Sequence, residues 1–435
     1  MLEELVVKAL DSAKQAGATA AEAGVSEISG FAVNVRMGEV ETVEQNHDKG
    51  IDVTVYFGQR SGTAGTSDLS LDSLELTVQK ACYMAKMTAE DPCAGLADKA
   101  LLAFDYQDLD LNHPWDITIE QAIAQAQASE AEGLAVDKRI TNSEGVGISS
   151  QQCNSIYANS CGFIGGYRTT RHRMECSLLA EENGAKQRDY DYTVARSNDQ
   201  LEDFATVAKQ TANKTIQRLG ARTIPTANVP VIFAAKVAKS LWGSLLSAVS
   251  GGQIYRQASF LQGAVGEKIF PEFVRVDERP HLLKMLGSAP FDAEGVRTNN
   301  KFIIKDGVLQ TYLLGSYSAR KLKMQSTGNS GGVHNLFISH GDDDLTAMLK
   351  TMNRGLLVTE LIGQGVNIIT GDYSRGAFGF WVENGEIQYP VHEITIAGNL
   401  KEMYKNIIAV GNDIDKHGSL FTGSVLVDNM MVAGS

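Results

Sequence analysis

The sequence predicts an α+β fold in two domains. Residues 1–222 are expected to form an antiparallel sheet with helices, and residues 228–435 a β-rich barrel or sandwich-like domain with a few helices. The first observation is length, because 435 residues are too many for one ordinary core. In the first half, strand and helix patterns come in runs, which favours an antiparallel sheet over βαβ winding. In the second half, short strand patterns and glycines dominate.

The N-terminal domain begins with an amphipathic helix over Leu2 to Gln15. Further helices are expected at Leu71 to about Met87, behind the cap Ser70, at about Ile119 to Ala135 and at about Gln200 to Leu219. Alternating apolar residues between turn residues predict the strands. These are Ala21–Ser29, Ala32–Glu41, Gly50–Phe57, Ile140–Ser150, Gln152–Asn159, Phe163–Thr170 and Arg173–Glu182.

The C-terminal domain opens with a strand, Val229–Ala234, that runs into a helix, Lys236–Val249. We expect Gly251-Gly252 to stop this helix in the left-handed cap conformation. Asp306-Gly307 and Asn384-Gly385 each stand between two strand patterns and predict two-residue hairpins. A helix is also predicted from Leu345 to about Arg354, with the preceding acids Asp342, Asp343 and Asp344 as its cap.

Composition excludes several classes of protein. The net charge is −13, from 39 basic and 52 acidic residues, which argues against direct binding of nucleic acid. No stretch has the roughly 18 apolar residues that a membrane span needs. The five cysteines form no CxxC pair, which argues against a zinc knuckle or a redox pair. Because an acidic N-terminus is unlike a signal peptide, we expect a cytoplasmic protein.

Three short patterns resemble catalytic motifs. Gly328 to Gly332 fits G-x-S-x-G around Ser330, with His334 close by, but a strand is predicted after it where a nucleophile elbow needs a helix. His392-Glu393 lies in a predicted strand and lacks the second His of a zinc-protease helix. The run from His340 to Asp344 could attract a hard cation, although helix capping accounts for its acids.

The segment Thr370 to Gly379 is the strongest candidate for a functional surface. It holds three glycines, Asp372, Tyr373 and Arg375, and Gly376 would let another backbone approach closely. The alternative is a tight turn between two strands with an Asp372–Arg375 ion pair, and both interpretations stay open.

Several long strings resemble the TldD/PmbA family, in its PmbA (TldE) branch, and the resemblance covers essentially the whole chain. They are Ser316–Leu322, Ser326–Asn335, Gly371–Gly376 and Phe380–Pro390, with shorter matches at Asp91–Gly95 and Ser259–Gly263.

The resemblance implies a subunit of a cytoplasmic TldD/TldE-type metalloprotease complex that acts on peptides and unfolded polypeptides. Peptide maturation, as of microcins, and antitoxin degradation are the implied processes. In the TldD branch a helix carries HExxxH, and a cysteine near the C-terminus supplies a third zinc ligand. At the corresponding place this chain has Ala238 to Gly243, and its second domain has no cysteine.

We therefore expect no catalytic residue and no metal ligand in this chain, and zinc in a TldD-type partner. Whether the chain alone forms a homodimer stays open. The expected substrate-groove or interface residues are Ser330, Gly331, His334, Asp372, Tyr373, Arg375 and Gly376. One alternative is a peptidase in its own right that uses Ser330 and His334, or a metal held by His334, His340 and Asp342. Another is a gyrase-associated regulator.

Overall fold

A computed structural model describes residues 2–434. Its helices are α1 (Leu2–Gln15), α2 (Leu71–Met87), α3 (Ile119–Leu134), α4 (Phe204–Gln217), α5 (Ala235–Ala248), α6 (Gly251–Tyr255), α7 (Ser316–Leu322), α8 (Leu345–Met352) and α9 (Leu400–Lys405), with the 3₁₀ turns η1 (Lys99–Leu101) and η2 (Asn198–Gln200). The strands of the N-terminal half are β1 (Ala20–Arg36), β2 (Glu39–Phe57), β3 (Arg60–Thr66), β4 (Ile140–Asn159), β5 (Ile164–Glu182) and β6 (Ala185–Ala195).

The strands of the C-terminal half are shorter. They are β7 (Ala227–Phe233), β8 (Val276–Glu278), β9 (Lys301–Lys305), β10 (Val308–Leu309), β11 (Leu336–Ile338), β12 (Gly355–Ile362), β13 (Asp372–Glu383), β14 (Glu386–Asn399), β15 (Ile407–Val410), β16 (Leu420–Phe421) and β17 (Val425–Ala433). The predicted α+β class is confirmed. Among the described residues, no helix is long and apolar enough to cross a membrane.

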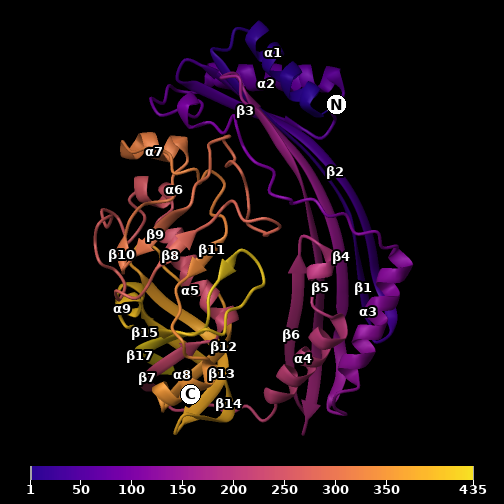
Figure 1. Cartoon of the computed structure of the whole chain (residues 1–435), viewed down its shortest axis with the longest axis vertical. Coiled ribbons are helices and arrows are strands. Elements are labelled where there is room, and N and C mark those ends of the chain that lie inside the picture. The colour runs from indigo at the N-terminus through magenta and orange to yellow at the C-terminus, as the bar shows by residue number, and fades with distance from the viewer. Residues whose placement is uncertain (1, 435) are drawn as a thin grey trace.

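The N-terminal half is one antiparallel sheet with the strand order β3-β2-β1-β4-β5-β6 (Figure 1). Its strands are longer than predicted: β1 and β2 each run through segments that we expected to be breaks. Asn46 and Asp48 lie between the predicted strands Ala32–Glu41 and Gly50–Phe57, but each pairs with a residue of β1, Gly30 and Ile28. Tertiary pairing therefore overrides local propensity here. The strands β3 and β6 were not predicted.

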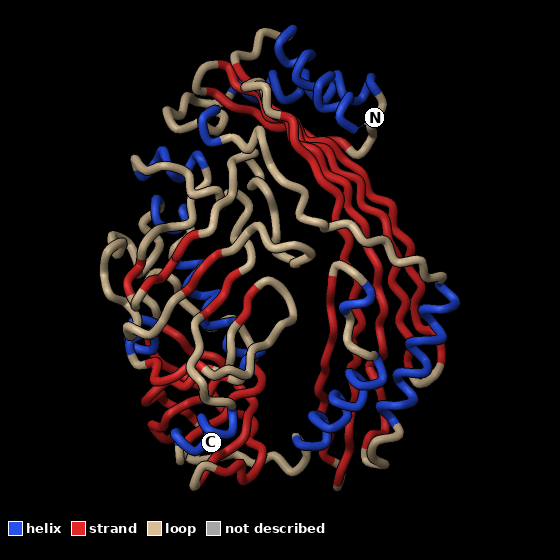
Figure 2. The backbone as a smooth tube through the Cα atoms, in the orientation of Figure 1, coloured by secondary structure: helices blue, strands red, loops and turns tan. Residues whose placement is uncertain are grey.

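Helices cover one face of this sheet at two places along its length (Figure 2). At one end α1 and α2 bury Val25 and Ile51 of the sheet. At the other end α3 and α4 bury Val33, Ile148 and Met174. Because residues two apart on a strand share a face, Val25 and Val33 lie on the same side of β1. The opposite face is turned toward the C-terminal half.

The C-terminal half contains a closed barrel and a second sheet, as the prediction of a barrel-like domain requires. The order β14-β13-β12-β7-β17-β15, with an added pairing of β14 to β17, closes a ring of β7, β12, β13, β14 and β17. The second sheet has the order β10-β9-β8-β11-β16. Side chains of both sheets join one core, which includes Ile303 from β9 and Val231 from β7.

Local turn and cap signals are confirmed. Asp306 and Gly307 both have positive φ angles, 51° and 78°, and so do Asn384 and Gly385, at 56° and 74°. Two successive positive φ angles characterise the type I′ hairpin turn. The Asp344 side chain accepts a hydrogen bond from the Ala347 N–H at 2.8 Å and caps α8.

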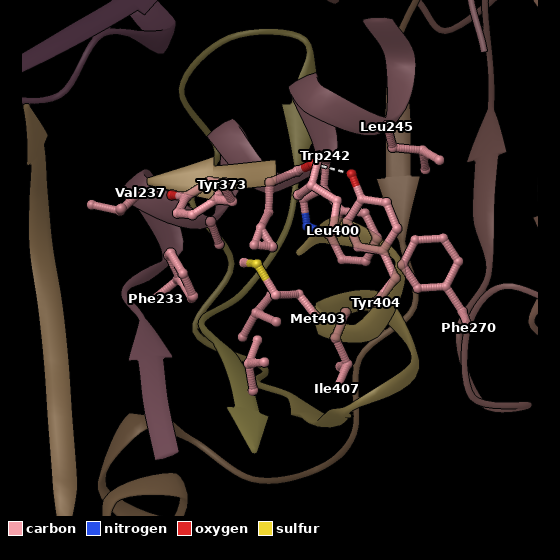
Figure 3. Packing of buried hydrophobic residues seen from close by; sticks show 14 of the residues in the cluster. Phe233, Val237, Trp242, Leu245, Phe270, Tyr373, Leu400, Met403, Tyr404 and Ile407 are labelled. Atoms are coloured by element: carbon pink, nitrogen blue, oxygen red, sulfur yellow. Dashed lines mark hydrogen bonds between the residues drawn. The ribbon is translucent and has the colours of Figure 1, made fainter. Parts of the chain in front are cut away.

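The helix α5 packs at the centre of the C-terminal core. Trp242 is 1% exposed and its ring lies 5.6 Å from Phe270, which stacks on Tyr404 at 4.6 Å (Figure 3). The Tyr404 hydroxyl donates to the Leu241 carbonyl at 3.1 Å. The apolar face of this helix is thus part of the core.

The expectation for Gly251-Gly252 is wrong in its mechanism. Neither residue has a positive φ, and Gly251 begins α6 instead of capping α5. A Cβ at Gly251 would lie 2.4 Å from the Ser318 Oγ of α7. Glycine is needed there because α6 and α7 approach closely.

Hydrogen bonds between the loop around Asp91 and α7 connect the two halves. Arg320 donates to the carbonyls of Cys93, Gly95 and Leu96 at 2.8 to 2.9 Å. Asp91 accepts from the Tyr317 hydroxyl at 2.7 Å, and together with the Lys321 ammonium this holds the Asp91 pKa at about 2. Two of the segments that carry the family resemblance therefore contact each other.

Candidate functional site

The glycine-rich loop from Gly328 to His334 separates two hollows of the surface. The first, of about 460 Å³, lies between the N-terminal sheet and the C-terminal half. The second, of about 580 Å³, lies between this loop and the helices α6 and α7. Ser330, Gly331 and Gly332 line both. Gly331 and Gly332 have φ angles of 92° and 129°, and a Cβ at Gly332 would meet nothing within 4 Å, so backbone is open to solvent here.

A buried carboxylate, Glu278 at the end of β8, fixes this loop. Glu278 is 0% exposed and accepts from the backbone N–H and the Nδ1 of His334, both at 2.7 Å. It also accepts from the side-chain amide of Asn329 at 2.9 Å and pairs with the Lys301 ammonium at 2.7 Å. Burial opposes its ionisation, but His334 and Lys301 lower the Glu278 pKa.

The other end of the loop is held by Asp292. Its carboxylate accepts from the backbone N–H groups of Ser330, Glu294 and Val296 at 2.9 to 3.0 Å. Burial nevertheless raises the Asp292 pKa to about 6. Sequence reasoning missed both Glu278 and Asp292, because each lies far from the loop along the chain and in no recognisable motif.

The geometry does not favour Ser330 and His334 as a nucleophile and its base. Such a pair needs a direct hydrogen bond. Within residues 2–434 no hydrogen bond joins these two side chains, and the Nδ1 of His334 is engaged by Glu278. The residues after Ser330 lead to strand β11 and not to a helix, as expected.

The second predicted group lies on β13 and lines neither hollow. Asp372 accepts from Thr370 at 2.6 Å and Asn399 at 3.1 Å, so the expected Asp372–Arg375 ion pair is not formed. Tyr373 is 1% exposed and its ring packs against Phe233 in the core. Burial raises its pKa to about 12. Gly376 pairs with Ile362 and Thr395 inside the sheet.

The outer face of α5 carries an ionic network that sequence reasoning missed. Lys236 and Lys214 both contact the carboxylate of Asp191 on β6, and Lys239 pairs with Asp415 at 2.8 Å. Burial alone would raise the Asp191 pKa, but the two lysines lower it below its usual value. These pairs join α5 to the N-terminal sheet and to the loop before β16. The only signal in the sequence was a pair of lysines three residues apart.

His417 extends this network. Its Nδ1 lies 2.7 Å from Asp415 and its Nε2 lies 2.9 Å from Glu202 of the N-terminal half. The hydrogen bond to Asp415 raises the His417 pKa, against the effect of burial.

We therefore expect His417 to make stability depend on pH. Because its folded-state pKa is raised, its contribution is complete below about pH 6.5, the ordinary value, and is lost as pH rises through the raised value. Denaturant unfolding of the wild type and of His417→Gln, measured between pH 5.5 and 8.5, checks this. The difference between them should shrink toward high pH, and a constant difference would contradict it.

The residues around α5 do not fit a catalytic zinc site. Zinc prefers His, Cys and carboxylate ligands with one open position. Here the outward positions of the helix are taken by Lys236, Lys239 and Ser240, and the Trp242 indole donates to Thr422 at 2.9 Å where the C-terminal segment passes. Among residues 2–434, no group of three His, Cys, Asp or Glu side chains could hold a metal ion.

Comparison with known proteins agrees with this architecture. Three domain families match in order, described as PmbA/TldA metallopeptidase domain 1 (residues 21–85), central domain (112–219) and C-terminal domain (226–434). The chain is 50% identical to Metalloprotease PmbA of Escherichia coli O157:H7, over all of this chain and 96% of that protein. The chain belongs to the PmbA/TldD family.

Solved structures of the family share the fold. A protein of Bacteroides thetaiotaomicron, named for a proposed role as a modulator of DNA gyrase, superposes with a TM-score of 0.94 at 25% identity, over 99% of this chain and 98% of its own. TldE from Thermococcus kodakarensis superposes with a TM-score of 0.85 at 20% identity, over the full length of both chains. The latter likeness shows the fold alone.

Proposed function

We propose that this chain is the non-zinc subunit of a cytoplasmic TldD/TldE-type metalloprotease that acts on peptides and unfolded polypeptides. A TldD-type partner brings the zinc. The observation that carries this proposal is the face of α5, where the family resemblance places the HExxxH motif. That segment, Ala238 to Gly243, contains no His, Glu or Cys, and its one charged residue, Lys239, is held in an ion pair with Asp415. An ammonium group cannot serve as a ligand while it is protonated.

In this assembly the chain contributes to a groove for extended peptide. The two hollows beside Ser330, Gly331 and Gly332 support this role, because their lining includes exposed backbone without side chains in the way. A backbone edge of this kind can bind a peptide main chain and read little of its sequence. His334 acts here as a positioning residue, since Glu278 holds its ring and its N–H.

The proposal predicts peptidase activity only in the mixture. The purified chain, the TldD-type partner and their equimolar mixture are assayed on an unfolded polypeptide such as casein. We expect no cleavage by either protein alone and chelator-sensitive cleavage in the mixture. Chelator-sensitive cleavage by the chain alone would contradict the proposal.

The same assay separates the serine-hydrolase alternative. Ser330→Ala removes only the hydroxyl. If Ser330 merely lines the groove, this hydroxyl is not needed, so the mixture should keep its activity. Loss of activity with an intact fold would instead favour Ser330 as nucleophile. No observation on the described residues favours the gyrase-regulator alternative, which rests on the names of two structural relatives.

A further inference from the structure

A single charged residue, Glu294, lines the hollow between the glycine-rich loop and the helices α6 and α7. The hollow measures about 580 Å³, which falls in the range of small-ligand sites, roughly 300 to 1,000 Å³. Its other lining residues carry no charge, and several are glycines. The apolar and aromatic ones are Leu246, Leu313, Val333, Tyr255 and Tyr317. One carboxylate in such a wall suits a cationic group on an apolar stem.

The carboxylate of Glu294 is fixed through one oxygen and leaves the other free. Glu294 lies in the tight turn from Asp292 to Val296, and its Oε2 accepts from the Ser316 N–H at 2.8 Å. Its Oε1 accepts no hydrogen bond from the described residues. A Cβ at Gly315 would lie 3.2 Å from this oxygen and 3.2 Å from the Ser330 Oγ, so glycine leaves room for both groups beside the hollow.

The cations near this hollow are engaged elsewhere. Arg320 donates to backbone carbonyls of the loop around Asp91, and Lys321 pairs with Asp91 itself at 3.0 Å. The guanidinium of Arg256 lies over the Tyr255 ring, 5.1 Å from its centroid. None of them pairs with the carboxylate at the hollow, which forms no ion pair with any residue that the structure describes. Its negative charge is therefore uncompensated.

Two further carboxylates add to the negative potential. Glu22 is held by neutral groups, the Tyr56 and Tyr157 hydroxyls at 2.7 and 2.6 Å, and Asp292 by backbone N–H groups. Burial raises the pKa of both carboxyls, and the charge of Glu294 adds to this effect. A cation bound beside Glu294 would reduce the repulsion among the three groups.

We propose that this hollow binds a lysine or arginine side chain of the peptide, with Glu294 as the residue that determines this specificity. The inference rests on the proposed function, because the glycine-rich loop holds the backbone of the same peptide. The ammonium or guanidinium group donates a charge-assisted hydrogen bond to the free Oε1 of Glu294. Its aliphatic stem lies against Leu246 and Leu313. The charge and the apolar wall of the hollow then both have a partner.

The test is peptide binding to the full chain, alone and mixed with a TldD-type partner from which zinc has been removed, so that no peptide is cleaved. The probes are short alanine peptides, blocked at both ends, with lysine, norleucine or glutamate at the centre. We expect the lysine peptide to bind about tenfold more tightly than the norleucine peptide, because it adds a hydrogen bond between charged groups. The glutamate peptide should bind most weakly.

Glu294→Gln keeps an acceptor for the Ser316 N–H and removes the charge. This variant should bind the lysine peptide no more tightly than the norleucine peptide, whose binding should stay as in the wild type. Glu402→Gln on α9 makes the same charge change at a side chain that is 68% exposed. It serves as the control and should leave the preference for lysine unchanged.

Equal binding of the lysine and norleucine peptides, or a preference for lysine that survives Glu294→Gln, would overturn the inference and leave the groove in place. A norleucine peptide with a free N-terminus that binds as tightly as the blocked lysine peptide would assign the hollow to an N-terminal ammonium and overturn the side-chain assignment. If no peptide binds, alone or in the mixture, the proposed groove and this inference fail together. The cleavage assay tests the zinc partnership separately.

Discussion

Glu278→Ala lowers the free energy of unfolding by about 3 to 5 kcal/mol, because it leaves the Lys301 ammonium without its counter-charge in a buried place. Lys301 is 17% exposed and the His334 side chain 9%, so water reaches neither freely. The side-chain amide of Asn329 and the N–H of His334 also lose their acceptor. The loop that separates the two hollows should lose its order together with this stability.

Denaturant unfolding measures the first effect, and hydrogen exchange of the amides from Asn329 to His334 measures the second. Glu278→Gln keeps an acceptor but loses the charge and should fall between wild type and alanine. Asp277→Ala, on the same strand as Glu278, removes the partner of the half-exposed Arg279; it is the control and should cost below about 1 kcal/mol. Equal effects of the Asp277 and Glu278 variants would refute the role given to Glu278.

Trp242→Ala costs about 3 to 5 kcal/mol of unfolding free energy, since a large aromatic side chain leaves a cavity in a closed core. Its ring contacts Phe270, and its indole N–H is bonded to Thr422. Because α5 is anchored by this side chain, the lysines on its outer face should lose their fixed positions as well.

Two further variants make this prediction specific. Trp242→Phe keeps most of the apolar contact and loses the hydrogen bond, so it should cost about 1 to 2 kcal/mol. Ser247→Ala on the exposed face of α5 should be nearly neutral. If Trp242→Ala unfolds at the same temperature or denaturant concentration as Ser247→Ala, the core does not anchor this helix.

Local signals in the sequence predicted the parts of the fold that short-range chemistry determines. The Asp-Gly and Asn-Gly turns and the Asp344 cap need only neighbouring residues, and they lie as expected. The length of β2 depends instead on the pairing of Asn46 and Asp48 with β1. No local pattern contains that information.

The candidate site shows the same division. Ser330, Gly331 and His334 lie at the hollows, and the sequence marked them through a glycine-rich string. Tyr373 also lies in a glycine-rich segment of the sequence, but the structure shows that it is a core residue. Glu278 lies in no recognisable sequence motif. It holds His334 only because the fold brings β8 next to the loop.

The central claim is that this chain does not hold the catalytic zinc, and metal retention tests it most directly. The purified chain is incubated with excess Zn²⁺, freed of unbound metal by gel filtration and analysed for zinc, beside the TldD-type partner treated identically. We predict no retained zinc in this chain and about one ion per partner chain. One tightly held zinc per molecule of this chain would contradict the account, because ligands would then come from residues assigned to ion pairs and core.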